Sequence, residues 1–285
     1  MPQPPTVRRN TSGLARDVAV LDLLADAERT GEGGLGVLRV AAALGRDKAA
    51  VSRALATLAD AGLVSRDPHR LTYSLGPRLY ALAALTAESS LARQARPVLR
   101  QMVHQLRETT HLCVLRGGNV LTLVSEVSPQ QVGTLAWAGS TTAAWLTPSG
   151  RVLISDWDRA SVDSWYAAHG QDAGLVDHPT PPALGAFSVP AAPDPARVVV
   201  RDLLSLHAEL ARVRRRGWAV SDEELETGVV AASSPVRDAT GSVVAALNVS
   251  APRTRLGERL DELGSYLARC AATLSTQLGA PAPGG

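Results

Sequence analysis

One predicted helix begins with small and cationic side chains of the kind that contact DNA. Arg and Lys can donate hydrogen bonds to the acceptors of guanine in the major groove, and Ser can donate to a phosphate. Lys48 is the single lysine of a chain with 29 Lys and Arg residues. We therefore expect the N-terminal end of this helix to enter the major groove. The residues expected to contact DNA there are Lys48, Ala49, Ser52 and Arg53.

The surrounding sequence, residues 37–75, predicts the elements that would position this surface. A short helix with one apolar side ends at Gly45, which can leave helical φ and ψ without steric cost. Asp47 stands where its carboxylate can cap the next helix, whose apolar face repeats at i, i+4 and i+7 from Val51. Two helices joined by a tight turn are typical of a helix-turn-helix.

Two segments with alternating apolar residues follow and indicate strands joined by a polar turn at residues 66–70. The turn carries Arg66, His69 and Arg70, which we expect near the DNA backbone or in the minor groove. This wing favours a DNA reader. A small helical subdomain with ordinary solvated cations is the alternative.

The charge distribution agrees with a reader at the N-terminal end. The net charge of the 285-residue chain is only +2. Residues 1–78 carry 11 Lys and Arg against 8 Asp and Glu, whereas the remainder carries 18 against 19. The small positive excess therefore lies where phosphate neutralisation would need it.

The rest of the chain predicts a second domain of the α+β class. Hairpins are expected around the loops at residues 116–119 and 237–241, with helices near 149–157, 161–169, 198–216 and 256–278. Together they predict one antiparallel sheet with helices around it. The expected parts are a disordered arm (1–12), a winged helix-turn-helix domain (13–77), a linker and dimerisation helix (78–95), an effector-binding domain (96–279) and a disordered tail (280–285).

The linker has more apolar surface than one small domain needs, which makes it a natural contact between two copies of the chain. The residues expected at this contact are Leu79, Leu82 and Leu85.

Several classes of function lack the residues they require. The sequence has no GxSxG, HExxH, P-loop or GxGxxG motif, so we expect no enzyme and no cofactor. Cys113 and Cys270 show no zinc spacing and are expected to be free thiols. The histidines without spaced acidic or cysteine partners are His111, His169, His178 and His207, so no metal is expected. Without a signal peptide or an apolar run of about 18 residues, we expect a cytoplasmic protein with no membrane partner.

Four sequence blocks together carry a family resemblance. Over nearly all of residues 13–278 the chain resembles IclR-type transcriptional regulators. The resemblance implies a winged helix-turn-helix, a linker helix and a GAF-like effector-binding domain. It also implies a dimer or pair of dimers on palindromic double-stranded operator DNA, responding to a small-molecule effector. The blocks are AVSRALATLADAGLVSRDP, LGPRLYAL, WLTPSGRVLIS and LARVRRRGWAVSDEELETGVVAASSPVRDATGSVVAALNVSAP.

The resemblance also implies where the effector lies. Its anion end would be Thr147, Ser149 and Gly150, and a helix that starts there would expose backbone N–H groups to a carboxylate. Asp222 would form a polar wall. The sheet floor would be Asn248 and Ser250, with Trp137 and Trp145 nearby.

Two positions depart from the family pattern. Arg151 replaces the frequent Lys, and Ala231 stands where several members have Cys. With the nearby tryptophans, the lost thiol favours a more apolar or aromatic effector than a two- or three-carbon acid.

Simpler interpretations of these residues stay open. Ser149 could be only a helix cap, and the five tryptophans could belong to the core or an interface. A regulator without an effector and an enzyme acting on a small acid remain alternative functions. The carboxylates Asp222, Glu223, Glu224 and Glu226 resemble a solvated turn, and Arg212, Arg214, Arg215 and Arg216 a solvated helix end.

Overall fold

The computed structural model describes residues 13–130, 139, 141–172, 175–177 and 194–281. The expected N-terminal arm, Trp137, His178 and most of the expected tail lie outside these residues. The chain divides near Ser89 into two compact units. Within the described residues, no helix is both long and apolar enough to cross a membrane.

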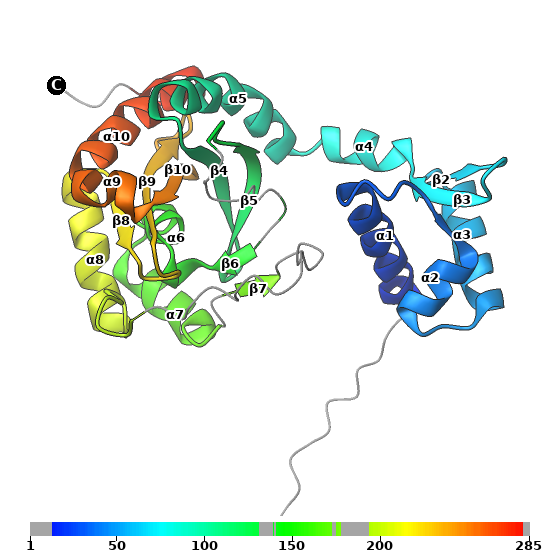
Figure 1. The fold of residues 1–285 in the computed structure, drawn as a ribbon. Helices are drawn as coiled ribbons and strands as arrows, with labels where there is room; N and C mark the ends of the chain where they lie inside the picture. The colour runs from blue at the N-terminus through cyan, green and yellow to red at the C-terminus, as the bar shows by residue number, and fades with distance from the viewer. Residues whose placement is uncertain (1–12, 131–138, 140, 173–174, 178–193, 282–285) are drawn as a thin grey trace, which may run out of the picture. The chain divides into compact units, whose positions relative to one another are not determined.

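The first unit is a winged helix-turn-helix, as predicted (Figure 1). Its small antiparallel sheet has the strand order β1-β3-β2. The helices bury a shared apolar core that includes Val20, Leu24, Val51 and Leu55. The elements are α1 (Gly13–Arg29), β1 (Leu35–Gly36), α2 (Val37–Leu44), α3 (Lys48–Asp60), β2 (Val64–Asp67), β3 (Thr72–Leu75) and α4 (Pro77–Ala84).

Local chemistry sets the turns of this unit. Gly45 ends α2 in the left-handed region with φ of 60°, and the Asp47 carboxylate accepts the Ala50 N–H at 2.9 Å to cap α3. Gly76 lies so close to the end of α3 that a Cβ there would collide with the Gly62 carbonyl oxygen. A glycine is therefore required where the wing passes into α4.

The expected linker, residues 78–95, is not one helix. It comprises most of α4, a break around Leu85 and Thr86, and the first part of α5 (Ala87–Leu106). Helix α5 continues through Pro97, an imino acid that removes a backbone N–H from the helix.

The second unit contains a seven-stranded antiparallel sheet with the order β7-β6-β5-β4-β10-β9-β8. The two predicted hairpins are β4–β5 and β9–β10, and they meet where β4 pairs with β10. Strands β6, β7 and β8 were not expected, because three or four residues leave little period-two pattern. The strands are β4 (Thr109–Arg116), β5 (Asn119–Glu126), β6 (Thr141–Ala143), β7 (Leu175–Asp177), β8 (Ala219–Asp222), β9 (Val229–Arg237) and β10 (Val243–Pro252).

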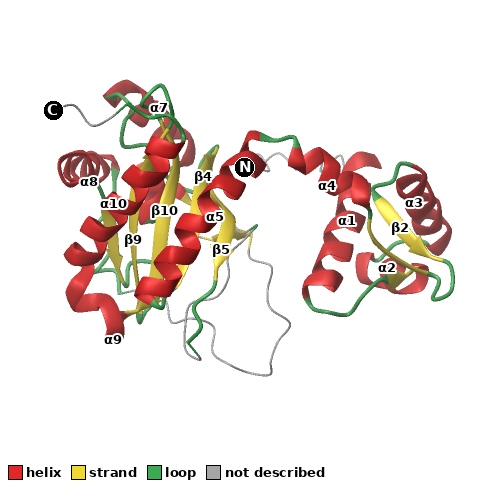
Figure 2. Cartoon of the chain, turned by 90° about the horizontal axis from the view of Figure 1, so that it is seen from above, coloured by secondary structure: helices red, strands yellow, loops and turns green. Residues whose placement is uncertain are grey.

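Helices cover both faces of this sheet. Figure 2 shows α5 and α10 (Leu260–Gln277) side by side across one face. Leu247 belongs to the core on that face, whereas its neighbour Ala246 belongs to the core under α6, α7 and α8. Alternation along β10 therefore places Ala246, Asn248 and Ser250 on the α6 side. The remaining elements are η1 (Ala144–Leu146), α6 (Pro148–Leu153), α7 (Arg159–His169), α8 (Leu203–Arg216), α9 (Arg253–Leu256) and η2 (Gly257–Arg259).

Two helices are shorter than the sequence pattern indicates. Helix α6 ends at Leu153 and not near Trp157. Helix α8 begins at Leu203 and not at Val198, because Asp202 and Ser205 form a reciprocal capping box at its start.

Candidate functional site

The N-terminal half of α3 presents the predicted DNA-contacting side chains to solvent. Lys48, Ala49, Ser52 and Arg53 are exposed, while Val51 on the inner face is fully buried. Spacings of i, i+1, i+4 and i+5 bring the four to one side of the helix. This side of α3 carries cationic and small side chains, as a surface that enters a groove must.

The wing tip is ordered by one carboxylate. Asp67 accepts the backbone N–H groups of His69 at 2.8 Å and Arg70 at 3.0 Å. These bonds, that of Arg70 first, lower the pKa of the Asp67 carboxyl. The Arg66 guanidinium lies 5.9 Å from the centre of the Tyr73 ring. Arg66, His69 and Arg70 are all exposed, so the three predicted cations share an ordered tip.

The predicted dimer contact lies on a helix that is poorly covered by its own unit. No residue of α4 is buried in the described structure. Leu82 is 52% exposed and Leu85, which follows the helix, is 85% exposed, while Leu79 is half-buried. Tyr80 adds a further exposed ring.

In the second unit, three of the predicted effector residues join one hydrogen-bonded row on the α6 side of the sheet. The Ser149 and Ser233 hydroxyl oxygens are 2.8 Å apart, and the Asn248 amide donates to the Ser233 oxygen at 2.7 Å. Ser250 donates to the Asn248 carbonyl oxygen at 3.2 Å. We call Ser149, Ser233, Asn248 and Ser250 the polar row. Sequence reasoning missed Ser233, because its place beside Asn248 depends on the β9–β10 register.

The start of α6 differs from the expectation. Thr147, and not Ser149, is the cap, and its hydroxyl oxygen accepts the Gly150 N–H at 3.0 Å. The Gly150 N–H is therefore already bonded and does not lie free for an anion. A Cβ on Gly150 would collide with the Ala144 carbonyl oxygen, so this glycine serves close packing. Ser149 is buried and turned to the sheet.

Arg151 is a buried structural residue. Its guanidinium forms a two-bond ion pair with the Glu224 carboxylate, at 2.7 Å and 3.1 Å. The other three N–H donors reach the carbonyl oxygens of Trp145, Leu146 and Val220. Both side chains are almost fully buried, at 1% and 3% exposure. Glu224 is thus not part of a solvated turn, and every donor of Arg151 is taken.

Asp222 lies on the other side of β8 from the polar row. Its neighbour Ser221 pairs in register with Ala231, which shares a face with Ser233, so alternation turns Asp222 away. The carboxylate forms ion pairs with Arg253 at 2.7 Å and Arg197 at 3.2 Å. The geometry therefore does not place Asp222 in the wall of a site around the polar row.

The tryptophans serve mostly in packing. Trp165 contacts Trp157 edge to face and donates its N–H to the Gly117 carbonyl oxygen at 2.9 Å. Trp145 meets Tyr166 edge to face, and its indole N–H is buried without a hydrogen-bond partner among the described residues. Trp145 therefore places an unbonded indole N–H close to α6.

Strand β4 adds two side chains to the same face as the polar row. Cys113 pairs in register with Ala246 and His111 with Asn248. Burial raises the pKa of the Cys113 thiol to about 11, with opposing hydrogen bonds from Thr122 and Ser149. A thiol therefore lies beside Ser149, supplied by β4 and not by the Ala231 position. Neither residue was expected here, because the sequence pattern does not reveal that β4 lies next to β10.

The His111 ring is neutral, and only one of its two nitrogens has a hydrogen-bond partner among the described residues. Its Nδ1 lies 2.8 Å from the Ser125 hydroxyl oxygen, and its Nε2 is buried without a partner among the described residues. Burial lowers the pKa of the imidazole to about 4.

Two further histidines each pair with an aspartate. His169 pairs with Asp172 at 3.0 Å and His207 with Asp163 at 2.6 Å. Over the described parts of the chain, no three His, Cys, Asp or Glu residues gather as a metal site would need.

The arginines at the end of α8 are not simply solvated. Arg212 and Arg216 pair with the buried Glu209 carboxylate, and Arg214 donates to the carbonyl oxygens of Ser155 and Trp157. The bonds of Arg214 hold α8 to the segment after α6, whereas the pairs with Glu209 lie within α8.

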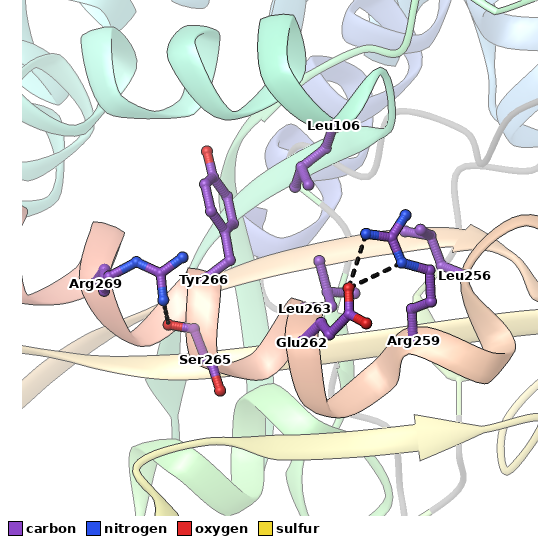
Figure 3. A pocket seen from close by; sticks show the side chains of 8 residues that line it. All are labelled: Leu106, Leu256, Arg259, Glu262, Leu263, Ser265, Tyr266 and Arg269. Carbon is purple, nitrogen blue, oxygen red and sulfur yellow. Dashed lines mark hydrogen bonds and ion pairs between the residues drawn. The ribbon is translucent and has the colours of Figure 1, made fainter.

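A surface cavity of about 470 Å³ lies on the opposite face of the sheet, over α10 and the end of α5 (Figure 3). It contains none of the predicted effector residues. Arg259 at its rim is directed to Glu262, at 2.8 Å. Its lining comprises Leu106, Leu256, Arg259, Glu262, Leu263, Ser265, Tyr266 and Arg269.

Comparison with known proteins gives the same two-part organisation. The Pca regulon regulatory protein of Pseudomonas putida is 30% identical over 241 residues, which cover 84% of this chain and 74% of that protein. The IclR structure of Thermotoga maritima has a TM-score of 0.69 at 19% identity and covers 93% of this chain and 98% of that one. An IclR homologue from Microbacterium hydrocarbonoxydans, complexed with 4-hydroxybenzoate, has a TM-score of 0.69 at 21% identity and covers 93% and 100%.

Two family models match the chain, one for each unit. The IclR helix-turn-helix domain matches residues 13–68, which include the whole of α3 and the first strand of the wing. The family described as bacterial transcriptional regulator IclR C-terminal matches residues 83–173 and 196–276. With an exposed cationic reading helix, a wing and a helix-covered antiparallel sheet in this order, the chain belongs to the IclR family of bacterial transcriptional regulators.

Proposed function

We propose that this transcriptional regulator responds to a small organic acid bound beside the polar row and reads a palindromic operator as a dimer or pair of dimers. The observation that carries the proposal is the pairing of two separate surfaces in one chain. One is exposed and cationic on α3 and the wing. The other is a buried set of neutral hydrogen-bonding groups in the C-terminal unit.

The DNA-contacting surface suits sequence reading. Lys48, Ser52 and Arg53 stand at the N-terminal end of α3, where a recognition helix meets base edges. Arg66, His69 and Arg70 extend from the wing and suit phosphates or the minor groove. A reader of this size gains affinity when two copies bind two half-sites one helical turn apart, which is why we expect a palindrome.

Helix α4 is the element we assign to dimerisation. Leu82, and Leu85 directly after the helix, stay exposed within their own unit, and apolar surface of this kind favours burial against a partner. Leu82→Glu should then shift the protein toward monomer, measured by analytical ultracentrifugation. A matched charge on an already polar exposed position, Thr57→Glu on α3, should leave the mass unchanged.

The effector is expected to be a carboxylate with an apolar or aromatic body. Trp145 and Tyr166 supply aromatic surface near α6, and hydroxyl, amide and imidazole groups supply neutral hydrogen bonds. The homologue from Microbacterium hydrocarbonoxydans was solved with 4-hydroxybenzoate, which recommends that acid as a first probe. For the effector to regulate, it must bind one arrangement of the protein more tightly than another.

A thermal-shift panel of small carboxylates and aromatic acids tests the proposal. A ligand at 100 times its Kd should stabilise the protein by about 2.7 kcal/mol. Tight operator binding without a shift from any acid would instead support a regulator without an effector. If chromatography showed that the protein consumes an acid, that result would support an enzyme.

A further inference from the structure

The Nε2 atom of His111 is a buried polar atom that the described structure leaves unsatisfied. The His111 side chain is 3% exposed and stands in β4, at the centre of the sheet. Its other ring nitrogen is held by Ser125 at 2.8 Å. Buried polar groups without a hydrogen-bond partner are rare in native structures, because each hydrogen bond that such a group fails to make costs stability.

His111 stands on the face of the sheet that carries the polar row. His111 and Asn248 are directly opposite each other in the β4–β10 ladder, a placement that brings side chains on one face into contact range. Asn248 in turn donates to Ser233, which bonds with Ser149. The unsatisfied nitrogen therefore adjoins the site proposed for the effector.

The site offers this nitrogen a neutral environment. Ser125 and Asn248, which flank the ring, are uncharged, and the guanidinium of Arg151 on α6 donates all five of its N–H groups to other acceptors. The ring carries no charge near pH 7. A charged oxygen placed against it would lose hydration without gaining an ion pair. A hydroxyl group costs less to bury and can donate or accept, so it suits either tautomer of the ring.

We propose that Nε2 of His111 is a specificity-determining group that forms a hydrogen bond with the hydroxyl substituent of a hydroxy-aromatic acid. The inference rests on the proposed function, because the carboxylate and ring of that acid occupy the site beside the polar row. His111 then selects hydroxylated acids over the same acids without the hydroxyl group.

Calorimetric titration of the full-length protein with 4-hydroxybenzoate and benzoate tests this directly. The two probes share the ring and the carboxylate and differ in one hydroxyl group. The wild-type protein should bind 4-hydroxybenzoate about tenfold more tightly, the factor that one such hydrogen bond supplies. Equal affinities would overturn the role of His111 and leave the proposed function standing. Binding of neither acid would overturn the role of His111, and the thermal-shift panel of other acids would then decide the proposed function.

Two substitutions separate the two ring nitrogens. His111→Asn places a polar atom near the position of Nδ1, facing Ser125, and removes Nε2. His111→Gln places one near the position of Nε2. We expect the Asn variant to bind both acids with the affinity of benzoate and the Gln variant to regain part of the preference. An undiminished tenfold preference in the Asn variant would overturn the proposal.

Trp218→Phe is the matched control. The Trp218 indole N–H is also buried without a partner among the described residues, but its ring packs against Gly264 of α10. Removing this second unsatisfied atom should leave the preference between the acids unchanged. Loss of the preference in this variant as well would show a general effect of stability and would overturn the assignment. If His111→Asn does not fold, the wild-type comparison of the two acids still decides.

Discussion

The two surfaces of this regulator are built in opposite ways. The DNA-contacting surface comes from one continuous stretch, residues 48–70, and its side chains are exposed. The polar row and His111 come from α6, β4, β9 and β10, more than 130 residues apart at the extremes, and are mostly buried. An exposed surface can vary with little cost to folding. A buried one must satisfy its own hydrogen bonds before it can bind anything else.

The largest loss of folding stability is expected from a substitution at the most deeply buried charged pair. Removing one partner of the Arg151–Glu224 pair leaves a buried charge uncompensated, so Arg151→Met should destabilise the C-terminal unit by about 3–5 kcal/mol. Urea unfolding, monitored by tryptophan fluorescence, measures this loss of stability. Arg259→Met breaks an exposed pair with Glu262, 64% and 68% exposed, and should cost about 1 kcal/mol or less. Similar losses in both variants would contradict the contrast between buried and exposed contacts.

A change on the exposed surface should affect DNA binding and spare folding. Arg53→Ala should weaken operator binding by about 1–3 kcal/mol if Arg53 reads a base, with little change for random DNA. Fluorescence anisotropy at fixed salt measures both. Arg100→Ala on α5 removes an exposed cation of the other unit and serves as the control. Equal weakening on operator and random DNA would show a phosphate contact instead.

The buried site should make the stability of the C-terminal unit sensitive to mild acid. His111 has a pKa of about 4 when folded, below its ordinary 6.5, so the unfolded chain takes up the proton first. Its stabilising contribution is therefore complete above pH 6.5 and is lost as the pH falls toward 4. At pH 5.5 the loss should be about 1.4 kcal/mol.

Unfolding of the wild-type protein and His111→Asn at pH 7.5 and 5.5 measures this loss. The other histidines are common to both proteins, so the difference belongs to His111. An equal loss on acidification in the two proteins would refute the assignment.

The smallest effect is expected at the wing tip. Asp67→Ala removes the acceptor of two backbone N–H groups, but both are near solvent, so folding should lose about 0.5–1 kcal/mol. Operator affinity should fall because His69 and Arg70 lose their fixed positions. Asp67→Asn retains an acceptor oxygen and should recover most of the affinity. No recovery would indicate that the charge, and not the turn, matters.

Much of the fold could be predicted because its causes are local. Asp47 caps α3 and Gly45 ends α2 as expected, since capping and positive φ depend on a few neighbouring residues. The two hairpins of the C-terminal unit were also predicted from period-two alternation and short polar loops. The three-residue strands β6 and β7 were not, because such segments form only against a sheet that already exists.

The candidate effector site was predicted only in part. Ser149, Asn248 and Ser250 do lie together, but Asp222 faces the other way and Thr147 takes the cap. The sequence predicts that side chains alternate between the two faces of a strand. An error of one position in the register assigns every side chain to the wrong face. Ser221 and Asp222 show how much that one position matters.

By itself, the sequence determined the order of elements, the winged helix-turn-helix and the cations on its reading face, because helical and strand periodicity act within a few residues. Only the tertiary structure decided that Arg151 is buried against Glu224 and that His111 and Cys113 share a face with Asn248 and Ser233. These contacts depend on which strands become neighbours in the sheet and on which charged side chains are buried as a pair. Both are properties of the whole packed sheet.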